Sequence, residues 1–182
     1  MKILYRVSSN SYKKQRLPKA TKEFCLENFI ENVVNHQNQL FLIGDNVEED
    51  LKKFLISKTA ENIEFIDQSF GSNGASFRFQ LELASSFNDD ELVLLQEDDY
   101  LYKQAAWPFH APITYEELFS QALEYADYAS VYDHPDKYLA PSRGGNKLIS
   151  ETGVESTGLF CTAHSHWKYT NSTTCTFAST AR

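Results

Sequence analysis

Cysteine is scarce in this chain of 182 residues, and its pattern predicts neither a disulfide framework nor a zinc site. The three residues, Cys25, Cys161 and Cys175, are an odd number and lack the close spacing of metal ligands. Such usage is typical of a reducing compartment, so we expect a cytoplasmic protein. A bond between Cys161 and Cys175 across a hairpin stays open as an alternative.

Long apolar runs are missing as well. The N-terminal segment Met1–Val7 has an apolar run far too short for the core of a signal peptide. No other stretch approaches the length that a bilayer requires. We therefore expect no membrane span.

Positive charge is limited, and a phosphate-binding loop is absent. The 17 Lys and Arg residues face 25 Asp and Glu residues, which gives a formal net charge of -8. This balance argues against nucleic acid or an anionic membrane as the main partner. The pattern G-x-x-x-x-G-K-[ST] does not occur, which disfavours a Walker-type nucleotide switch. Basic residues cluster near the start and form either a phosphate patch or a solvated loop; they are Lys13, Lys14, Arg16, Lys19 and Lys22.

What the chain does have is a regular alternation of strand-like and helix-like segments. Short apolar runs predict strands over residues 2–7, 39–43, 62–66 and 92–96. Apolar residues at helical spacing predict helices after Thr21 and over residues 47–57 and 75–87. This alternation indicates an α/β fold with a largely parallel sheet and helices on both faces.

The pattern changes after residue 102. Thr114 and Glu117 form a T-x-x-E capping box that begins a further helix. Thr-rich and aromatic segments then predict a mainly antiparallel C-terminal portion, with strands over residues 129–132, 147–150, 157–163 and 173–178. Because no convincing linker or internal repeat separates these parts, we expect one domain.

An acidic triplet follows the strand predicted over residues 92–96. Because that strand is a short apolar run with one polar residue, Gln96, at its end, it is expected to be buried on both faces of the sheet, with Glu97, Asp98 and Asp99 at its carboxyl end. Ligands of open α/β sheets bind at this edge. Three adjacent carboxylates repel one another, and a divalent cation would compensate them. The alternative is a solvated acidic turn.

The order of these features resembles a nucleotide-sugar-dependent glycosyltransferase of the GT-A fold, from the family-2-like group with an acidic DXD-type motif. The resemblance rests on the Ser/Asn-rich exit of the first strand, on Asp45 after the second, on Asn73-Gly74-Ala75 and on the acidic triplet. It implies a nucleotide-binding half over about residues 1–102 and an acceptor-binding half over about residues 103–182. The implied reaction transfers a sugar from a nucleotide-sugar donor, expected to be UDP-linked, to a glycan or another hydroxyl acceptor.

The resemblance also implies a role for individual residues. Asp99, with Asp98 beside it, would bind a Mn²⁺ or Mg²⁺ ion and act in catalysis. The residues expected around the nucleotide are Val7, Ser8, Ser9, Asn10, Arg16, Asp45, Asn73, Arg78, Gln96, Glu97 and Asp98. Several have structural alternatives: a turn at residues 8–10, a helix cap at Asp45, a tight turn at Asn73 and a solvated helix position at Arg78.

A second candidate region lies near the C-terminus. In a strand, His164 and His166 would point to the same face, where one of them would complete the metal shell. An exposed pair on an edge strand is the alternative. Trp167 offers a flat apolar face on which a sugar ring could stack, or else belongs to the core.

The catalytic base is the part of the transferase pattern that the sequence defines least. An inverting enzyme needs a carboxylate that reaches the acceptor hydroxyl, and Glu155 and Asp133 are the candidates. A retaining enzyme would not need one. Since the chain ends just past the last predicted strand, we expect a piece of a longer protein with further domains. Two other functions stay open: a metal-dependent nucleotidyltransferase or phosphoesterase, and a non-catalytic glycan-binding module.

Overall fold

A computed structural model describes residues 1–9, 20–103, 113–132, 159–169 and 176–182. The helices are α1 (Lys22–Val33), α2 (Glu49–Ser57), α3 (Asn73–Ala84) and α4 (Tyr115–Leu123). The strands are β1 (Lys2–Ser8), β2 (Gln39–Asp45), β3 (Ile63–Gln68), β4 (Leu92–Glu97), β5 (Tyr128–Ala129), β6 (Leu159–Cys161), β7 (His166–Lys168) and β8 (Phe177–Thr180). No helix among the described residues has both the length and the apolar character needed to cross a membrane.

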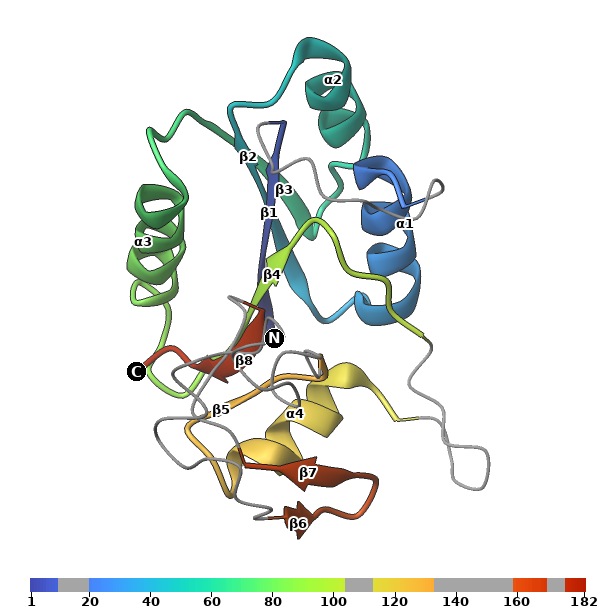
Figure 1. The fold of residues 1–182 in the computed structure, drawn as a ribbon, viewed down its shortest axis with the longest axis vertical. Coiled ribbons are helices and arrows are strands. Elements are labelled where there is room, and N and C mark those ends of the chain that lie inside the picture. The colour runs from blue at the N-terminus through green and yellow to red at the C-terminus, as the bar shows by residue number, and fades with distance from the viewer. Residues whose placement is uncertain (10–19, 104–112, 133–158, 170–175) are drawn as a thin grey trace, which may run out of the picture.

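The main sheet has six strands in the order β3-β2-β1-β4-β8-β5. The four strands from β3 to β4 run parallel, whereas β8 is antiparallel to both β4 and β5. The helices that connect the parallel strands lie beside them in the ribbon (Figure 1). The predicted α/β fold, with a largely parallel sheet and an antiparallel C-terminal part, is confirmed.

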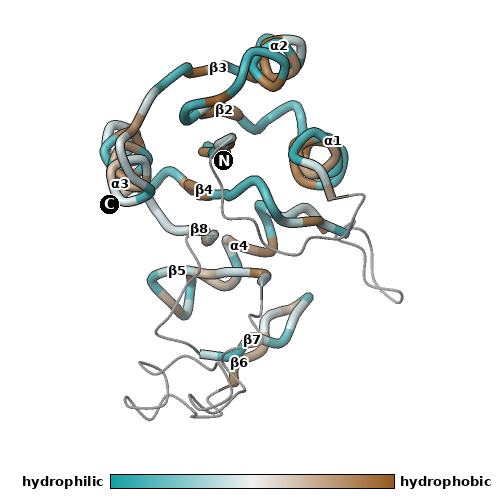
Figure 2. Tube along the Cα trace, turned by 45° about the horizontal axis from the view of Figure 1, so that its top comes forward, coloured by the Kyte–Doolittle hydropathy of each residue, from teal (hydrophilic) through white to brown (hydrophobic). Residues whose placement is uncertain are grey.

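Helices cover both faces of this sheet. In Figure 2, α3 lies on one side of the strands, and α1, α2 and α4 lie on the other. Alternate residues of β1 follow this division, because Ile3, Tyr5 and Val7 pack with α1 whereas Leu4 packs on the α3 side. Burial on both faces explains why the parallel strands are continuous apolar runs.

Local hydrogen bonds at the helix starts agree with the sequence prediction. The side chain of Thr21 accepts a hydrogen bond from the Phe24 backbone N–H and so caps α1. At α4, Thr114 Oγ1 accepts from the Glu117 N–H at 3.1 Å while a Glu117 carboxylate oxygen accepts from the Thr114 N–H at 2.8 Å. The capping box expected from T-x-x-E is therefore present.

The C-terminal strands differ from the prediction in their bounds. The strand expected over residues 129–132 is β5, which covers Tyr128 and Ala129 only. Of the segment 157–163, the strand β6 includes residues 159–161, and it pairs with β7 as a separate two-stranded hairpin. Cys161 is a free, exposed thiol opposite His166. The strand expected over residues 147–150 and the residue Cys175 lie outside the described part of the chain.

Candidate functional site

The carboxyl ends of the parallel strands meet at one edge of the sheet. The register aligns Ser8 at the end of β1 with Asp45 at the end of β2, and aligns Arg6 with Glu97 at the end of β4. The acidic triplet therefore lies at the same edge as the exits of β1 and β2, as the sequence predicted. This is the edge at which open α/β sheets bind their ligands.

Glu97 is neutralised by a cation that comes from the neighbouring strand. Arg6 is 8% exposed, and its Nη2 donates to Glu97 Oε2 at 2.7 Å. Burial raises the pKa of the Glu97 carboxyl above its ordinary value, while the Arg6 guanidinium opposes this shift. One feature of the sequence could have indicated this pair: Arg6 is a single charge inside an apolar strand, and such a charge requires a partner.

Asp98 is held by two groups from other elements. It is buried, its Oδ2 accepts a hydrogen bond from the Ser8 backbone N–H at 3.0 Å, and the same oxygen forms an ion pair with Lys22. Lys22 is the first residue of α1, so this contact joins β1, α1 and β4 at the edge. Of the predicted basic cluster, Lys22 thus pairs with a carboxylate, while Lys13, Lys14, Arg16 and Lys19 lie outside the described residues.

Asp99 differs from its two neighbours because its side chain is exposed. Within the described ranges it forms no ion pair or hydrogen bond. Mg²⁺ and Mn²⁺ need only one or two protein carboxylates when phosphate oxygens of a substrate supply further ligands. Asp99 fits such a site. Within the described residues, no three His, Cys, Asp or Glu side chains are grouped so that the protein alone could coordinate a metal ion.

Asp45 organises the loop after β3. It is buried, and its Oδ1 accepts hydrogen bonds from the Phe70 backbone N–H at 3.1 Å and from Asn46 Nδ2 at 2.8 Å. Asn46 has a φ of 52°, a left-handed conformation that asparagine tolerates better than most residues. A helix cap was the structural alternative for Asp45. Asp45 is not the N-cap of α2, however, because Glu48 occupies that position.

Gln96 lies on the opposite face from Glu97 and is fully buried. Its Oε1 accepts a hydrogen bond from the Tyr102 hydroxyl, and its Nε2 donates to the Glu97 carbonyl at 2.6 Å. The Tyr102 backbone N–H in turn donates to Asn28 Oδ1 of α1 at 2.6 Å. The side chain of Gln96 therefore fixes the segment after the acidic triplet against α1.

The other residues predicted to contact the nucleotide lie in different parts of the structure. Ser8 and Ser9 lie at the exit of β1, where Ser9 Oγ accepts from the Glu48 N–H at 2.9 Å, whereas Val7 is buried in the core. Asn73 and Arg78 belong to α3 and are exposed. Four predicted residues lie outside the described part of the chain: Asn10, Arg16, Asp133 and Glu155.

The expectation that His164 and His166 share a strand face is wrong. Only His166 belongs to β7, and His164 lies in the turn between β6 and β7, which the Thr162 N–H closes by donating to the Ser165 carbonyl at 2.9 Å. Strand alternation cannot align the two rings when one of them is in a turn. The His164 ring instead contacts the side chain of Gln121 on α4, at 3.0 Å from Nδ1 to Nε2.

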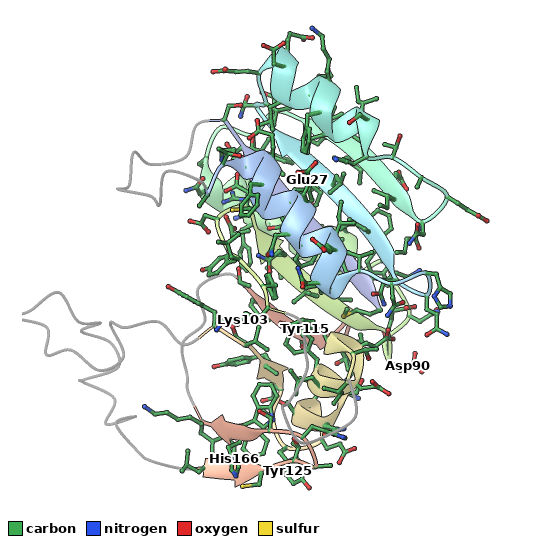
Figure 3. All side chains as sticks on the ribbon, turned by 90° about the vertical axis from the view of Figure 1, so that its right-hand side faces the viewer. Glu27, Asp90, Lys103, Tyr115, Tyr125 and His166 are labelled. Atoms are coloured by element: carbon green, nitrogen blue, oxygen red, sulfur yellow. The ribbon has the colours of Figure 1, made fainter. Side chains whose placement is uncertain are left out.

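A pocket of about 560 Å³ between α4, β5 and the β6–β7 hairpin was not predicted from the sequence. Tyr125, which follows the C-terminal end of α4, and His166 of β7 both line this pocket, and both are labelled in Figure 3. Trp167, which the sequence suggested as a surface for sugar stacking, is one of its lining residues. That the segment around β5 and the β6–β7 hairpin line one pocket follows from the tertiary fold, and sequence spacing does not reveal it.

Comparisons with protein-family models, with curated proteins and with solved structures found no match to this chain.

Proposed function

We propose that this domain is a metal-dependent glycosyltransferase that binds a nucleotide sugar at the carboxyl edge of its parallel strands. The observation that carries the proposal is the convergence of Ser8, Asp45 and the acidic triplet at that edge. Two of the three carboxylates are neutralised within the protein, and Asp99 alone is left exposed. This arrangement supports a site with one ligating carboxylate better than a solvated acidic turn, because Asp98 is buried and Glu97 is mostly so.

The residues of the chain would act by positioning. Arg6 and Lys22 hold Glu97 and Asp98 against β1 and α1, so the backbone that carries Asp99 is fixed before a ligand arrives. A Mn²⁺ or Mg²⁺ ion, when bound at Asp99, would neutralise charge on the departing nucleoside diphosphate. Ser8 and Ser9 would line the base and ribose, with UDP as the expected nucleotide. The catalytic base, for which Glu155 and Asp133 are the candidates, stays a prediction from the sequence.

Calorimetric titration tests this proposal. UDP and GDP are titrated, each with and without Mn²⁺, into the wild type and the variant Asp99→Ala. We expect one nucleotide to bind in a Mn²⁺-dependent way, and we expect Asp99→Ala to weaken that binding at least about tenfold, which corresponds to about 1.4 kcal/mol.

Asp90→Ala is the matched control. Asp90 is also an exposed aspartate, but it precedes β4 and so lies at the opposite end of the same strand (Figure 3). This variant should bind the nucleotide like the wild type. Absence of binding for both nucleotides, or an equal loss in the two variants, would contradict the proposed site.

A further inference from the structure

The pocket between α4, β5 and the β6–β7 hairpin has the size of a small-molecule site. Its volume of about 560 Å³ lies within the range of roughly 300–1,000 Å³ that is usual for ligand pockets. It is separate from the residues that form the acidic edge, and no step proposed above uses it.

Aromatic rings form much of its wall. The Phe160 ring lies 5.1 Å from that of Tyr125, 4.9 Å from that of Tyr169 and 6.3 Å from that of Trp167, measured between centroids. Phe160 and Trp167 are close to parallel, with 12° between their planes. Tyr125 is 54% exposed and Tyr169 is 42% exposed, so both rings present apolar surface that nothing in the described residues covers. Rings exposed in this way are suited to stacking with a ligand.

Polar residues also line the pocket. They come from residues 165–168 and from the segment around β5, and they are Asp127, Ser130, Ser165, His166 and Lys168. A lipid chain would require a uniformly apolar wall, because the buried polar groups would lose their hydrogen bonds to water. A sugar has apolar C–H faces and hydroxyl edges, so it can satisfy both kinds of group at once.

One residue of the pocket wall contacts the segment that follows the acidic triplet. Tyr132 lines the pocket, and its ring lies 4.6 Å from that of Tyr100 in an edge-to-face contact. Tyr100 directly follows Asp99. This contact connects the pocket wall to the segment that carries the residue proposed to bind the metal.

From this geometry we propose that the pocket binds the acceptor, and that the acceptor is an oligosaccharide rather than a lipid or a protein hydroxyl. The assignment as an acceptor site rests on the proposed transferase function, whereas the binding of carbohydrate rests on the pocket alone. Sugar rings stack on Tyr125 and Tyr169, and the polar side chains bind their hydroxyl groups.

NMR titration of the ¹⁵N-labelled protein tests the pocket. The probes are maltose, cellobiose, lactose, chitobiose and α-1,2-mannobiose. At least one of them is expected to shift the backbone amides of residues 165–169 in a saturable way. The variants Tyr125→Ala and Tyr169→Ala should each weaken that binding about tenfold, or about 1.4 kcal/mol. Both side chains are largely exposed, so these variants should fold, which an unchanged spectrum elsewhere will verify.

Phe24→Ala is the matched control, since Phe24 is 46% exposed on α1 and does not line the pocket. It should leave the saccharide shifts unchanged. The carbohydrate assignment is overturned if no disaccharide shifts residues 165–169, or if Phe24→Ala has the same effect as the pocket variants. Binding to phosphatidylcholine vesicles that is lost in Tyr125→Ala, without any saccharide binding, would overturn it in favour of a lipid.

The nucleotide titration on the same samples separates the two proposals. Tyr125→Ala should bind nucleotide like the wild type. Saccharide binding without any nucleotide binding would remove the transferase function and leave a glycan-binding module. Nucleotide binding without saccharide binding would remove the acceptor pocket and leave the transferase site.

Discussion

Arg6 is the residue that most clearly connects the core of the sheet to the acidic edge. It lies inside the apolar run of β1, yet its guanidinium reaches Glu97 on β4. One of its nitrogens, Nη1, is buried without a hydrogen-bond partner. A buried cation of this kind costs free energy unless its ion pair is maintained. The pair therefore couples the stability of the domain to the geometry of the candidate site.

We expect Glu97→Ala to lower the free energy of unfolding by about 3 kcal/mol, because Arg6 would remain as an unpaired buried charge. The double variant Arg6→Leu/Glu97→Leu should cost less than the sum of the corresponding single variants, since it removes both charges. Urea denaturation measures each value.

Asp50→Ala is the control for this prediction. Asp50 forms an ion pair with Lys53 at 3.6 Å, and both side chains are exposed. Its loss should change stability by no more than about 1 kcal/mol. If the costs of the single variants at Arg6 and Glu97 simply add in the double variant, the pair is not coupled.

The pH dependence of Glu97 has a definite sign. Because burial raises its pKa in the folded state, the folded protein holds this proton more tightly than the unfolded chain does. Its contribution to stability is therefore largest below the ordinary glutamate pKa of about 4.3 and decreases as the pH rises through the higher folded-state value. We therefore expect the urea midpoint to decrease less over this pH range in Glu97→Gln than in the wild type.

At the scale of elements, helix α4 begins with a capping box that local sequence determines. Thr114 and Glu117 satisfy each other's backbone N–H groups, which sets the residue at which α4 begins. Residues of α4 and β5 both line the pocket. The Thr114 backbone and hydroxyl donate to the Glu117 carboxylate, and they lower its pKa. The Glu117 carboxylate therefore adds stability at pH values above the ordinary glutamate pKa. This stability is lost as the pH falls through the lower pKa of the folded state.

Thr114→Ala should lower the free energy of unfolding by about 1 kcal/mol at neutral pH, because the cap of α4 is lost. The difference from the wild type should shrink as the pH falls below about 4.3, the ordinary glutamate pKa. Ser120→Ala removes an exposed hydroxyl from the same helix without affecting a cap, and should stay within about 0.5 kcal/mol of the wild type. A constant difference at all pH values would show that Glu117 does not contribute.

Elements such as these could be predicted because their causes are local. The four parallel strands were recognised as short apolar runs, and the capping box as two residues three positions apart. Contacts between distant residues could not be predicted in the same way. Lys22 and Asp98 are 76 positions apart, and Arg6 and Glu97 are 91 apart. The turn that separates His164 from β7 is also invisible to a rule that assumes continuous strand alternation.

At the scale of the whole molecule, β8 joins the two parts of the sheet. It lies between β4 and β5, antiparallel to both, and Ala178 is fully buried. β5 has no other partner strand among the described residues, so the pocket wall that includes Tyr128 and Ala129 depends on β8.

Deleting residues 176–182 should therefore remove the connection between the parallel strands and the pocket. We expect a loss of at least about 5 kcal/mol, comparable to the total stability of a marginal domain, together with loss of cooperative unfolding. Circular dichroism during urea denaturation measures both. Deleting Arg182 alone should leave the unfolding midpoint close to that of the intact chain, and a truncated protein that still unfolds at that midpoint would argue against the role of β8.

The place of β8 in the sheet also has a consequence for protein synthesis. All four parallel strands are complete when the ribosome has added Glu97, but β8 begins only at Phe177. During the interval between them, the nascent chain has an unpaired edge on β4, and such edges promote aggregation. Efficient expression would then depend on how well that edge is protected by chaperones until the last strand leaves the ribosome.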